Sequence, residues 1–142
     1  MKLNPDCVRD ILIWLENNIK VKNDNSFEIK RLTDLNSGLP QYSEEEIYYV
    51  VYNLFQANLI EGRFLLLPSG SPKICEINNI TWNGHQFLNN VRPKNIWDAT
   101  KAGASKLGIM SISALNTLAM EISKAVVTRP EIIQKIVDAF NL

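Results

Sequence analysis

Residues 43–60 read SEEEIYYVVYNLFQANLI and carry the clearest structural signal in the chain. Ser43 followed by Glu46 is a capping box, in which the two side chains satisfy backbone amides at the start of a helix. Glu44 and Glu45 add negative charge at the positive end of the helix dipole. The apolar residues that follow recur at helical spacing and predict one buried face: Ile47, Val50, Val51, Leu54 and Phe55. Most of this stretch is therefore predicted to be a helix that leads into a strand.

Three elements are predicted before this helix. Asn4 is a candidate N-cap and Pro5 suits a first helical turn, so a helix is expected from there to about Lys20. After a polar turn, the alternation of apolar and polar residues over 27–30 predicts a short strand. Residues 32–35 are expected to form a single helical turn.

The sequence that follows predicts a β-hairpin and another capped helix. Residues 62–67 and 73–80 flank a connection rich in Pro, Gly and Ser, which is typical of a hairpin loop. Thr81 can cap a helix over residues 82–90, with Trp82 available for burial. Gly84 lacks a side chain and would let the first turn of this helix lie close to the sheet.

The remainder of the chain is predicted to be helical. Lys94 to Lys106 follows Pro93, a second helix starts at Ser111 or Ser113, and Thr128 is expected to cap a last helix. These helices carry apolar stripes that must be buried somewhere, either on the same chain or against another copy. We expect a homo-oligomer that uses these side chains: Ile112, Leu115, Leu118, Ile122, Ile133, Ile136 and Phe140.

The order of these elements resembles that of a winged helix-turn-helix with a trailing helix. Residues 80–88, ITWNGHQFL, resemble the phrase that closes many winged-helix domains. Segments 2–12, 42–60 and 80–88, with Ile96-Trp97 after them, also resemble a family of short, uncharacterised proteins common in phages and prophages. The resemblance implies an α+β fold with a winged-helix domain over residues 1–92 and a helical appendage over 93–142. It names no activity, because a fold alone does not define one.

Composition and charge exclude several classes of protein. Fifteen basic and fifteen acidic side chains cancel, which argues against binding nucleic acid through bulk charge. Two cysteines and one histidine are too few for a disulfide scaffold or a zinc site built from Cys and His alone. No nucleophile or phosphate-loop motif occurs, so we expect no enzyme, no cofactor and no small-molecule substrate. The start of the chain does not resemble a signal peptide and no stretch is suited to a membrane, so a cytoplasmic location is expected.

The charge is divided unevenly and favours protein recognition over DNA recognition. Residues 1–90 carry 8 basic and 11 acidic side chains, net −3, and residues 91–142 carry 7 and 4, net +3. The 43–57 helix, which would meet DNA, therefore begins with carboxylates that repel phosphate. Its outward side instead offers tyrosines that suit protein contacts, unless they pack inside the same chain. The predicted interaction residues are Glu44, Glu45, Tyr48, Tyr52 and Gln56. A host or defence protein is the partner that the phage resemblance implies.

A DNA-binding regulator is the alternative. It would use a basic strip rather than the acidic helix, and the candidate contacts are Arg92, Lys94, Lys101 and Lys106, with Lys73 at the hairpin tip. The competing interpretation is that these side chains form an ordinary solvated surface. Cys7, close to a helix start, is either a thiol of lowered pKa or a small core-facing side chain.

Overall fold

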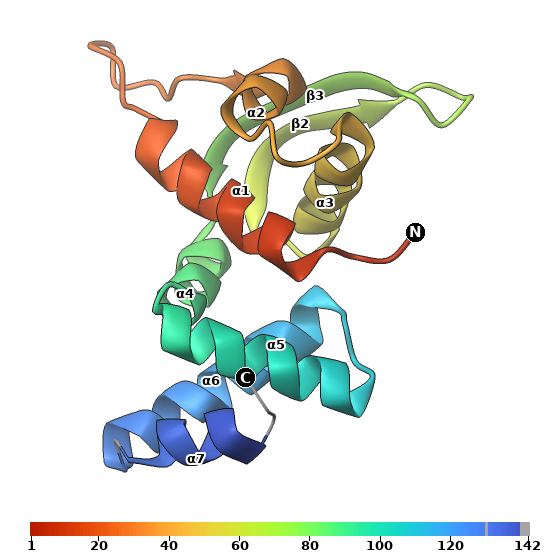
Figure 1. Cartoon of the computed structure of the whole chain (residues 1–142). Helices are drawn as coiled ribbons and strands as arrows, with labels where there is room; N and C mark the ends of the chain where they lie inside the picture. Colours follow the sequence, from red (N-terminus) through yellow and green to blue (C-terminus); the bar gives the residue numbers. More distant parts are fainter. Residues whose placement is uncertain (130, 140–142) are drawn as a thin grey trace.

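The computed structural model describes residues 1–129 and 131–139. Within them the chain forms seven helices and a three-stranded antiparallel sheet, so the predicted α+β class is confirmed. Figure 1 shows α1 crossing the molecule, with the sheet, α2 and α3 on one side of it and α4 to α7 on the other.

The first helix, α1 (Pro5–Asn18), begins where the sequence predicts. The Asn4 side chain accepts hydrogen bonds from the backbone amides of Asp6 (3.1 Å) and Cys7 (3.3 Å), which would otherwise lack partners. One face of α1 is fully buried, and it consists of Cys7, Val8, Ile11, Leu12 and Leu15.

The sheet has the strand order β1-β3-β2. Strands β2 (Ile60–Leu66) and β3 (Pro72–Ile80) form the predicted hairpin, and β1 (Lys30–Arg31) adds to the other edge of β3. The predicted strand over 27–30 is wrong in position. Phe27 makes only an isolated bridge with Val21, because the ladder is set by pairing of Lys30 with Ile77, a contact between distant segments.

Helices α2 (Leu32–Gly38) and α3 (Glu44–Gln56) connect β1 to the hairpin. The α2 helix is longer than the predicted single turn. The Ser43 hydroxyl accepts a hydrogen bond from the Glu46 amide at 3.1 Å, so the predicted cap of α3 is confirmed. The predicted stripe lies inward, with Phe55 only partly buried.

The sheet leads into α4 (Trp82–Val91) through a tight junction. Thr81 caps the helix, since its hydroxyl accepts from the Gly84 amide at 3.0 Å. Gly84 is buried against the sheet as predicted. Trp82, expected to be available for burial, is 77% exposed, because it occupies the first position of α4 on the side away from the core.

The C-terminal helices are α5 (Lys94–Leu107), α6 (Ile112–Thr128) and α7 (Ile132–Ala139). The sequence left Ser111 and Ser113 as alternative starts of this helix, and the structure has Ser111 as the cap of α6. Thr128 ends α6 instead of capping α7, because its hydroxyl donates to the carbonyls of Lys124 and Ala125 in the preceding turn.

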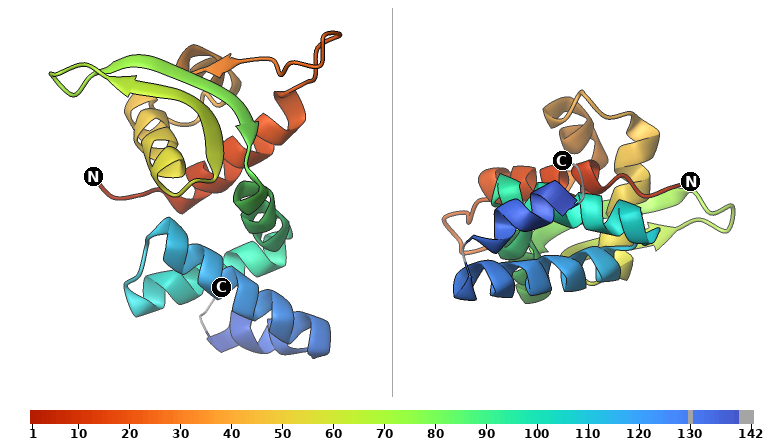
Figure 2. Two further views of the ribbon diagram at one scale, coloured as in Figure 1. Left: turned by 180° about the vertical axis from the view of Figure 1, so that it is seen from behind. Right: turned by 60° about the horizontal axis from the view of Figure 1, so that its bottom comes forward.

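The C-terminal helices fold back on the rest of the chain. Trp97 and Ala104 of α5 and Leu115 and Ala119 of α6 belong to the same buried cluster as α1 and α3. A smaller cluster, centred on Ile96, joins α5 and α6, and α7 packs against it. The left-hand view of Figure 2 shows α5, α6 and α7 below α1 from the opposite direction to Figure 1. Among the described residues, no helix is long and apolar enough to cross a membrane.

Candidate functional site

An aromatic cluster lies between α3 and the hairpin. Phe64 of β2 lies 5.0 Å from Phe55, 5.8 Å from Tyr52 and 6.4 Å from Tyr48, measured between ring centroids. All four side chains are partly exposed. The predicted Tyr48 and Tyr52 are thus brought together, and β2 supplies a further aromatic ring that the sequence analysis missed.

Three leucines of the hairpin are exposed beyond Phe64. Leu65, Leu66 and Leu67 are 50%, 44% and 43% exposed, and they follow Phe64 directly in the chain. Exposed large apolar side chains that adjoin one another mark interaction sites more often than isolated ones do. Successive side chains of a strand point to opposite faces, so Leu66 lies on the same side of β2 as Phe64 and Leu65 lies on the other side. The aromatic cluster and Leu66 are called the α3–hairpin face below.

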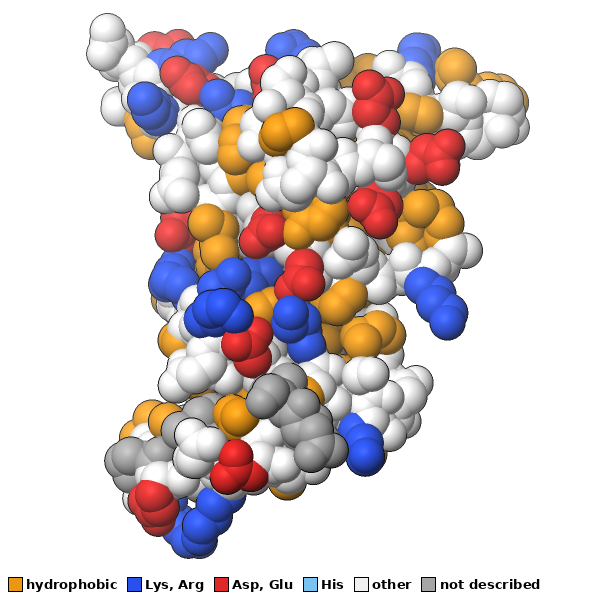
Figure 3. All heavy atoms as spheres, in the orientation of Figure 1, with side chains coloured by type: hydrophobic (Ala, Val, Ile, Leu, Met, Phe, Trp, Pro, Cys, Tyr) orange, Lys and Arg blue, Asp and Glu red, His pale blue; other side chains and the backbone are white. Residues whose placement is uncertain are grey.

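Carboxylates border the α3–hairpin face. Glu44 and Glu45 are exposed on the first turn of α3, one helical turn before Tyr48, and Glu61 is exposed on β2. Figure 3 shows acidic and hydrophobic side chains interleaved over α3 and the hairpin. Burial raises the pKa of the Tyr48 hydroxyl above its ordinary value, with smaller effects from Cys75 and Tyr52, so Tyr48 stays neutral at physiological pH.

Gln56 does not lie with the two tyrosines. It lines a different groove of about 770 Å³, together with Tyr49 and Asn53, the first three residues of the chain and the turn between α5 and α6. A residue eight positions along a helix from Tyr48 has rotated away from it, since 3.6 residues make one turn. The predicted interaction set is therefore divided between two surfaces.

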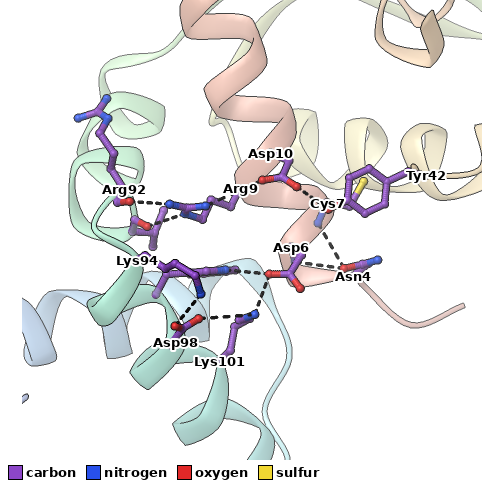
Figure 4. A network of polar contacts seen from close by, with 12 residues as sticks. Asn4, Asp6, Cys7, Arg9, Asp10, Tyr42, Arg92, Lys94, Asp98 and Lys101 are labelled. Atoms are coloured by element: carbon purple, nitrogen blue, oxygen red, sulfur yellow. Dashed lines mark hydrogen bonds and ion pairs between the residues drawn. The ribbon is translucent and has the colours of Figure 1, made fainter. Parts of the chain in front are cut away.

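Most of the predicted basic strip is engaged in contacts within the chain. Lys101 lies 2.9 Å from Asp6 of α1, Lys94 lies 2.8 Å from Asp98, and Arg92 pairs with Glu16 of α1. Figure 4 shows the network around Asp6, which faces Lys101. Lys101 therefore helps to hold α5 against α1, and Arg92 helps to hold the end of α4 against α1, whereas the pair of Lys94 and Asp98 lies within α5.

Further polar contacts complete this junction. Arg9 of α1 donates to the backbone carbonyls of Val91 (2.8 Å) and Arg92 (2.6 Å) at the end of α4. The indole nitrogen of Trp97 donates to Asp6 at 2.9 Å. Burial acts to raise the pKa of Asp6, but hydrogen bonds from Lys101 and Trp97 outweigh it, so the pKa lies below its ordinary value.

The other two predicted basic contacts lie apart. Lys73 is exposed on the hairpin and Lys106 is exposed at the end of α5. Neither has an ion-pair partner among residues 1–129 and 131–139. The structure thus does not gather the five predicted cations into one free strip.

The predicted oligomerisation residues are largely covered by the chain itself. Ile112, Leu115 and Ile122 are buried, and Leu118 and Ile136 are partly buried. These three buried side chains are unavailable to a second copy in this arrangement, because α6 packs on α4 and α5. The Ile133 side chain and Phe140 lie outside the described part of the chain.

Cys7 is buried in the core and Cys75 is partly buried against it. Burial, followed by Glu46 and Asp10, raises the pKa of Cys7 to about 12, and burial raises that of Cys75 to about 11. The lowered pKa considered for Cys7 is therefore wrong, because the core excludes the water that a thiolate needs. In the part of the chain that the structure describes, no cluster of three or more His, Cys, Asp or Glu could hold a metal ion.

The acidic partners of the basic strip were not predicted from the sequence. Asp6 and Glu16 lie on α1, and Trp97 meets Asp6 from 91 positions away. No local pattern could have paired them. Phe64 could have been named as a candidate, because an aromatic residue in a predicted hairpin strand has its ring on one face of the hairpin, where it can pack against a neighbouring helix.

The fold and the site together define an α+β domain with an exposed apolar face bordered by carboxylates. The chain belongs to the family DUF2513, described as a hypothetical protein, whose model matches residues 2–110. This confirms the expected membership of an uncharacterised family. The match ends in the turn between α5 and α6. No curated protein and no solved structure matches the chain.

Proposed function

We propose that this protein is a winged-helix module that recognises another protein through the α3–hairpin face. The element order α1, β1, α2, α3, β2, β3 and the strand order β1-β3-β2 support the winged-helix assignment. In that fold α3 is the helix that DNA-binding members place in the major groove. Here it carries three carboxylates at its start and partly exposed aromatic rings that pack against Phe64 of β2.

The observation that carries the proposal is an exposed leucine on the same side of the hairpin as a partly exposed aromatic cluster. Leu66, 44% exposed, lies two positions after Phe64 and on the same side of β2, and Phe64 packs against Phe55 of α3. Aromatic residues surrounded by a polar rim are typical of the centre of a protein interface. The carboxylates of Glu44 and Glu45 favour a partner with basic side chains around an apolar surface.

The ion pairs that the basic residues form within the chain argue against the DNA-binding alternative. Arg92, Lys94 and Lys101 each contact a carboxylate of the same chain, so contact with phosphate would compete with these pairs. The proposed module is non-enzymatic and needs no cofactor. A host or defence protein is the proposed partner class, which follows from the resemblance to phage-associated proteins.

Affinity capture with matched variants tests this proposal. Leu66→Glu, and separately Tyr52→Ala, should abolish capture of a partner from host lysate while circular dichroism shows that the fold is kept. Trp82→Glu is the control, because Trp82 is more exposed than Leu66 but lies on α4. Capture that survives Leu66→Glu, or is lost equally with Trp82→Glu, contradicts the assignment of this face.

A DNA titration tests the alternative. Fluorescence anisotropy with mixed-sequence duplex DNA at about 50 mM and about 200 mM salt spans the range over which phosphate contacts weaken strongly. We expect no binding at either salt concentration. Binding that falls steeply with salt, and that is lost in Lys73→Ala with Lys106→Ala, would favour the DNA-binding alternative.

A further inference from the structure

The free edge of the sheet borders the α3–hairpin face. In the strand order β1-β3-β2, the strand β2 is paired with β3 on one side only. Among residues 1–129 and 131–139, the backbone of β2 forms hydrogen bonds with no segment other than β3. Every second residue of an edge strand points its amide and carbonyl away from the neighbouring strand, so β2 offers a row of backbone groups to a further strand.

The edge of β2 is long enough and open enough to pair. The strand has seven residues and contains no proline. Gly62, its third residue, is exposed, and because glycine has no side chain this exposed surface belongs to the backbone. The opposite edge of the sheet is less suitable, since β1 already covers part of β3 there and Pro72 of β3 has no amide hydrogen.

The two sides of β2 differ in chemistry. Phe64 and Leu66 lie on the side of the α3–hairpin face. Arg63 lies on the other side, where it contacts Glu76 of β3. Glu61 is exposed two positions before Arg63 and lies on the same side, because the extra residue of the nearby bulge belongs to β3. A strand beside β2 would therefore meet apolar groups on one side and charged groups on the other.

The charged groups next to this edge are incompletely paired. Glu76 lies 2.9 Å from Arg31 and 3.5 Å from Arg63, so one carboxylate serves two guanidinium groups. The Arg63 side chain is 64% exposed. Glu61 has no ion-pair partner in the described part of the chain. One positive and one negative group on the same side of β2 are thus accessible to cross-strand partners of opposite charge.

We propose that the protein partner supplies an extended segment that adds a fourth strand to the sheet, antiparallel to β2. Its backbone bonds to the free amides and carbonyls of β2, and its side chains on one side are apolar because they cover Phe64 and Leu66. On the other side the segment carries an acidic residue beside Arg63 and a basic residue beside Glu61. Antiparallel pairing is the more stable arrangement per residue. The inference rests on the proposed function, since it states how a partner is held at the α3–hairpin face.

Isothermal titration calorimetry of the full chain with synthetic peptides tests the added strand. The probe is a seven-residue peptide with blocked ends, with valine at its odd positions, threonine at the second, glutamate at the fourth and lysine at the sixth. In the antiparallel register the glutamate lies beside Arg63 and the lysine beside Glu61. We expect the probe to bind about tenfold more tightly than the same peptide with glutamate and lysine exchanged, because the exchange places like charges opposite one another. No binding of the probe, or equal binding of the two peptides, overturns the proposal.

N-methylated versions of the probe test the backbone hydrogen bonds. One version is methylated at the odd-numbered amides and the other at the even-numbered amides. Only the version whose methyl groups face β2 should lose binding, because the amides of a strand point alternately to its two edges. Equal binding of both versions would show that the peptide does not pair with the edge of β2, and it overturns the proposal.

A charge exchange in the chain tests the register. The double variant Glu61→Arg with Arg63→Glu should reverse the preference between the two charged peptides. Lys73→Glu is the matched control, since Lys73 is exposed on β3, and it should leave the preference unchanged. Circular dichroism checks that both variants keep the fold. A preference that is not reversed by the double variant, or that is reversed equally by Lys73→Glu, overturns the proposed register.

The outcomes separate this inference from the proposed function. Loss of partner capture in Leu66→Glu, together with no binding of the probe, overturns the added strand alone. Binding of the probe with the expected preference, together with unchanged capture in Leu66→Glu, overturns the proposed function alone.

Discussion

At the scale of single residues, the junction between the sheet and α4 depends most on Gly84. A Cβ atom at this position would lie 2.0 Å from the carbonyl oxygen of Leu59 and 2.5 Å from Cγ2 of Ile80. The first contact is with a backbone atom, which cannot move away by a change of rotamer as a side-chain atom can. Thr81 fixes the same junction, since its hydroxyl donates to the Asn58 carbonyl at 2.7 Å while capping α4.

Gly84→Ala should therefore destabilise the protein, although alanine favours helices. The added methyl group forces α4 away from Leu59, and overpacking of this kind costs about 1–3 kcal/mol of the free energy of unfolding. Urea unfolding measures the difference. The control is Asn83→Ala in the same turn, an exposed position where the change should be neutral or slightly stabilising. Equal free energies of unfolding for the two variants would mean that the close approach of Gly84 to Leu59 does not affect stability.

At the scale of elements, an ion pair and a hydrogen bond hold α5 on α1. Because the pKa of Asp6 is lower in the folded chain than its unfolded value of about 3.9, its contribution to stability is present above about pH 4. That contribution is lost as the pH falls through the lowered pKa. Acid should therefore weaken the contact between the two helices.

A double-mutant cycle with Asp6→Asn and Lys101→Met measures this contact. The Asp6 side chain is 50% exposed, so we expect a coupling at the upper end of the range for exposed pairs, about 1 kcal/mol at neutral pH. It should shrink as the pH is lowered toward about 3. The pair Glu121–Lys124, in which both side chains are more exposed, is the control and should couple less. A coupling that does not change with pH would show that Asp6 is not the titrating partner.

The elements also show how far the sequence could predict the structure. The caps at Asn4, Ser43 and Thr81 were predictable, because a cap is a contact between residues two or three positions apart. The position of β1 was not, because its pairing with β3 joins segments that are far apart in sequence.

The same distinction between local and distant contacts applies to the candidate site. Helical spacing placed Tyr48 and Tyr52 away from the buried stripe of α3, and in the structure both are partly exposed and pack against Phe64 of β2. Phe64 could join them only once the hairpin had folded over α3. The engagement of Lys101 with Asp6 depended on how α5 docks, which no local pattern specifies.

At the scale of the whole molecule, the buried core is continuous from α1 to α6. Trp97 is 2% exposed and belongs to the same cluster as Leu12 and Phe87, although it lies beyond residue 92, where the sequence suggested a boundary. The family match likewise extends through α5 to residue 110. Helices α5 and α6 should therefore unfold together with the sheet and α1 rather than as a separate unit.

Trp97→Ala tests this continuity. Removal of a buried tryptophan should lower the free energy of unfolding by about 3–5 kcal/mol, because it leaves a cavity and removes the indole N–H that donates to Asp6. Calorimetry should show one transition whose midpoint falls as a whole. Trp82→Ala is the control and should have little effect, since that side chain is 77% exposed. Two transitions, of which Trp97→Ala shifts only one, would mean that the C-terminal helices form an independent domain whose packing on α1 adds little to the stability of either part.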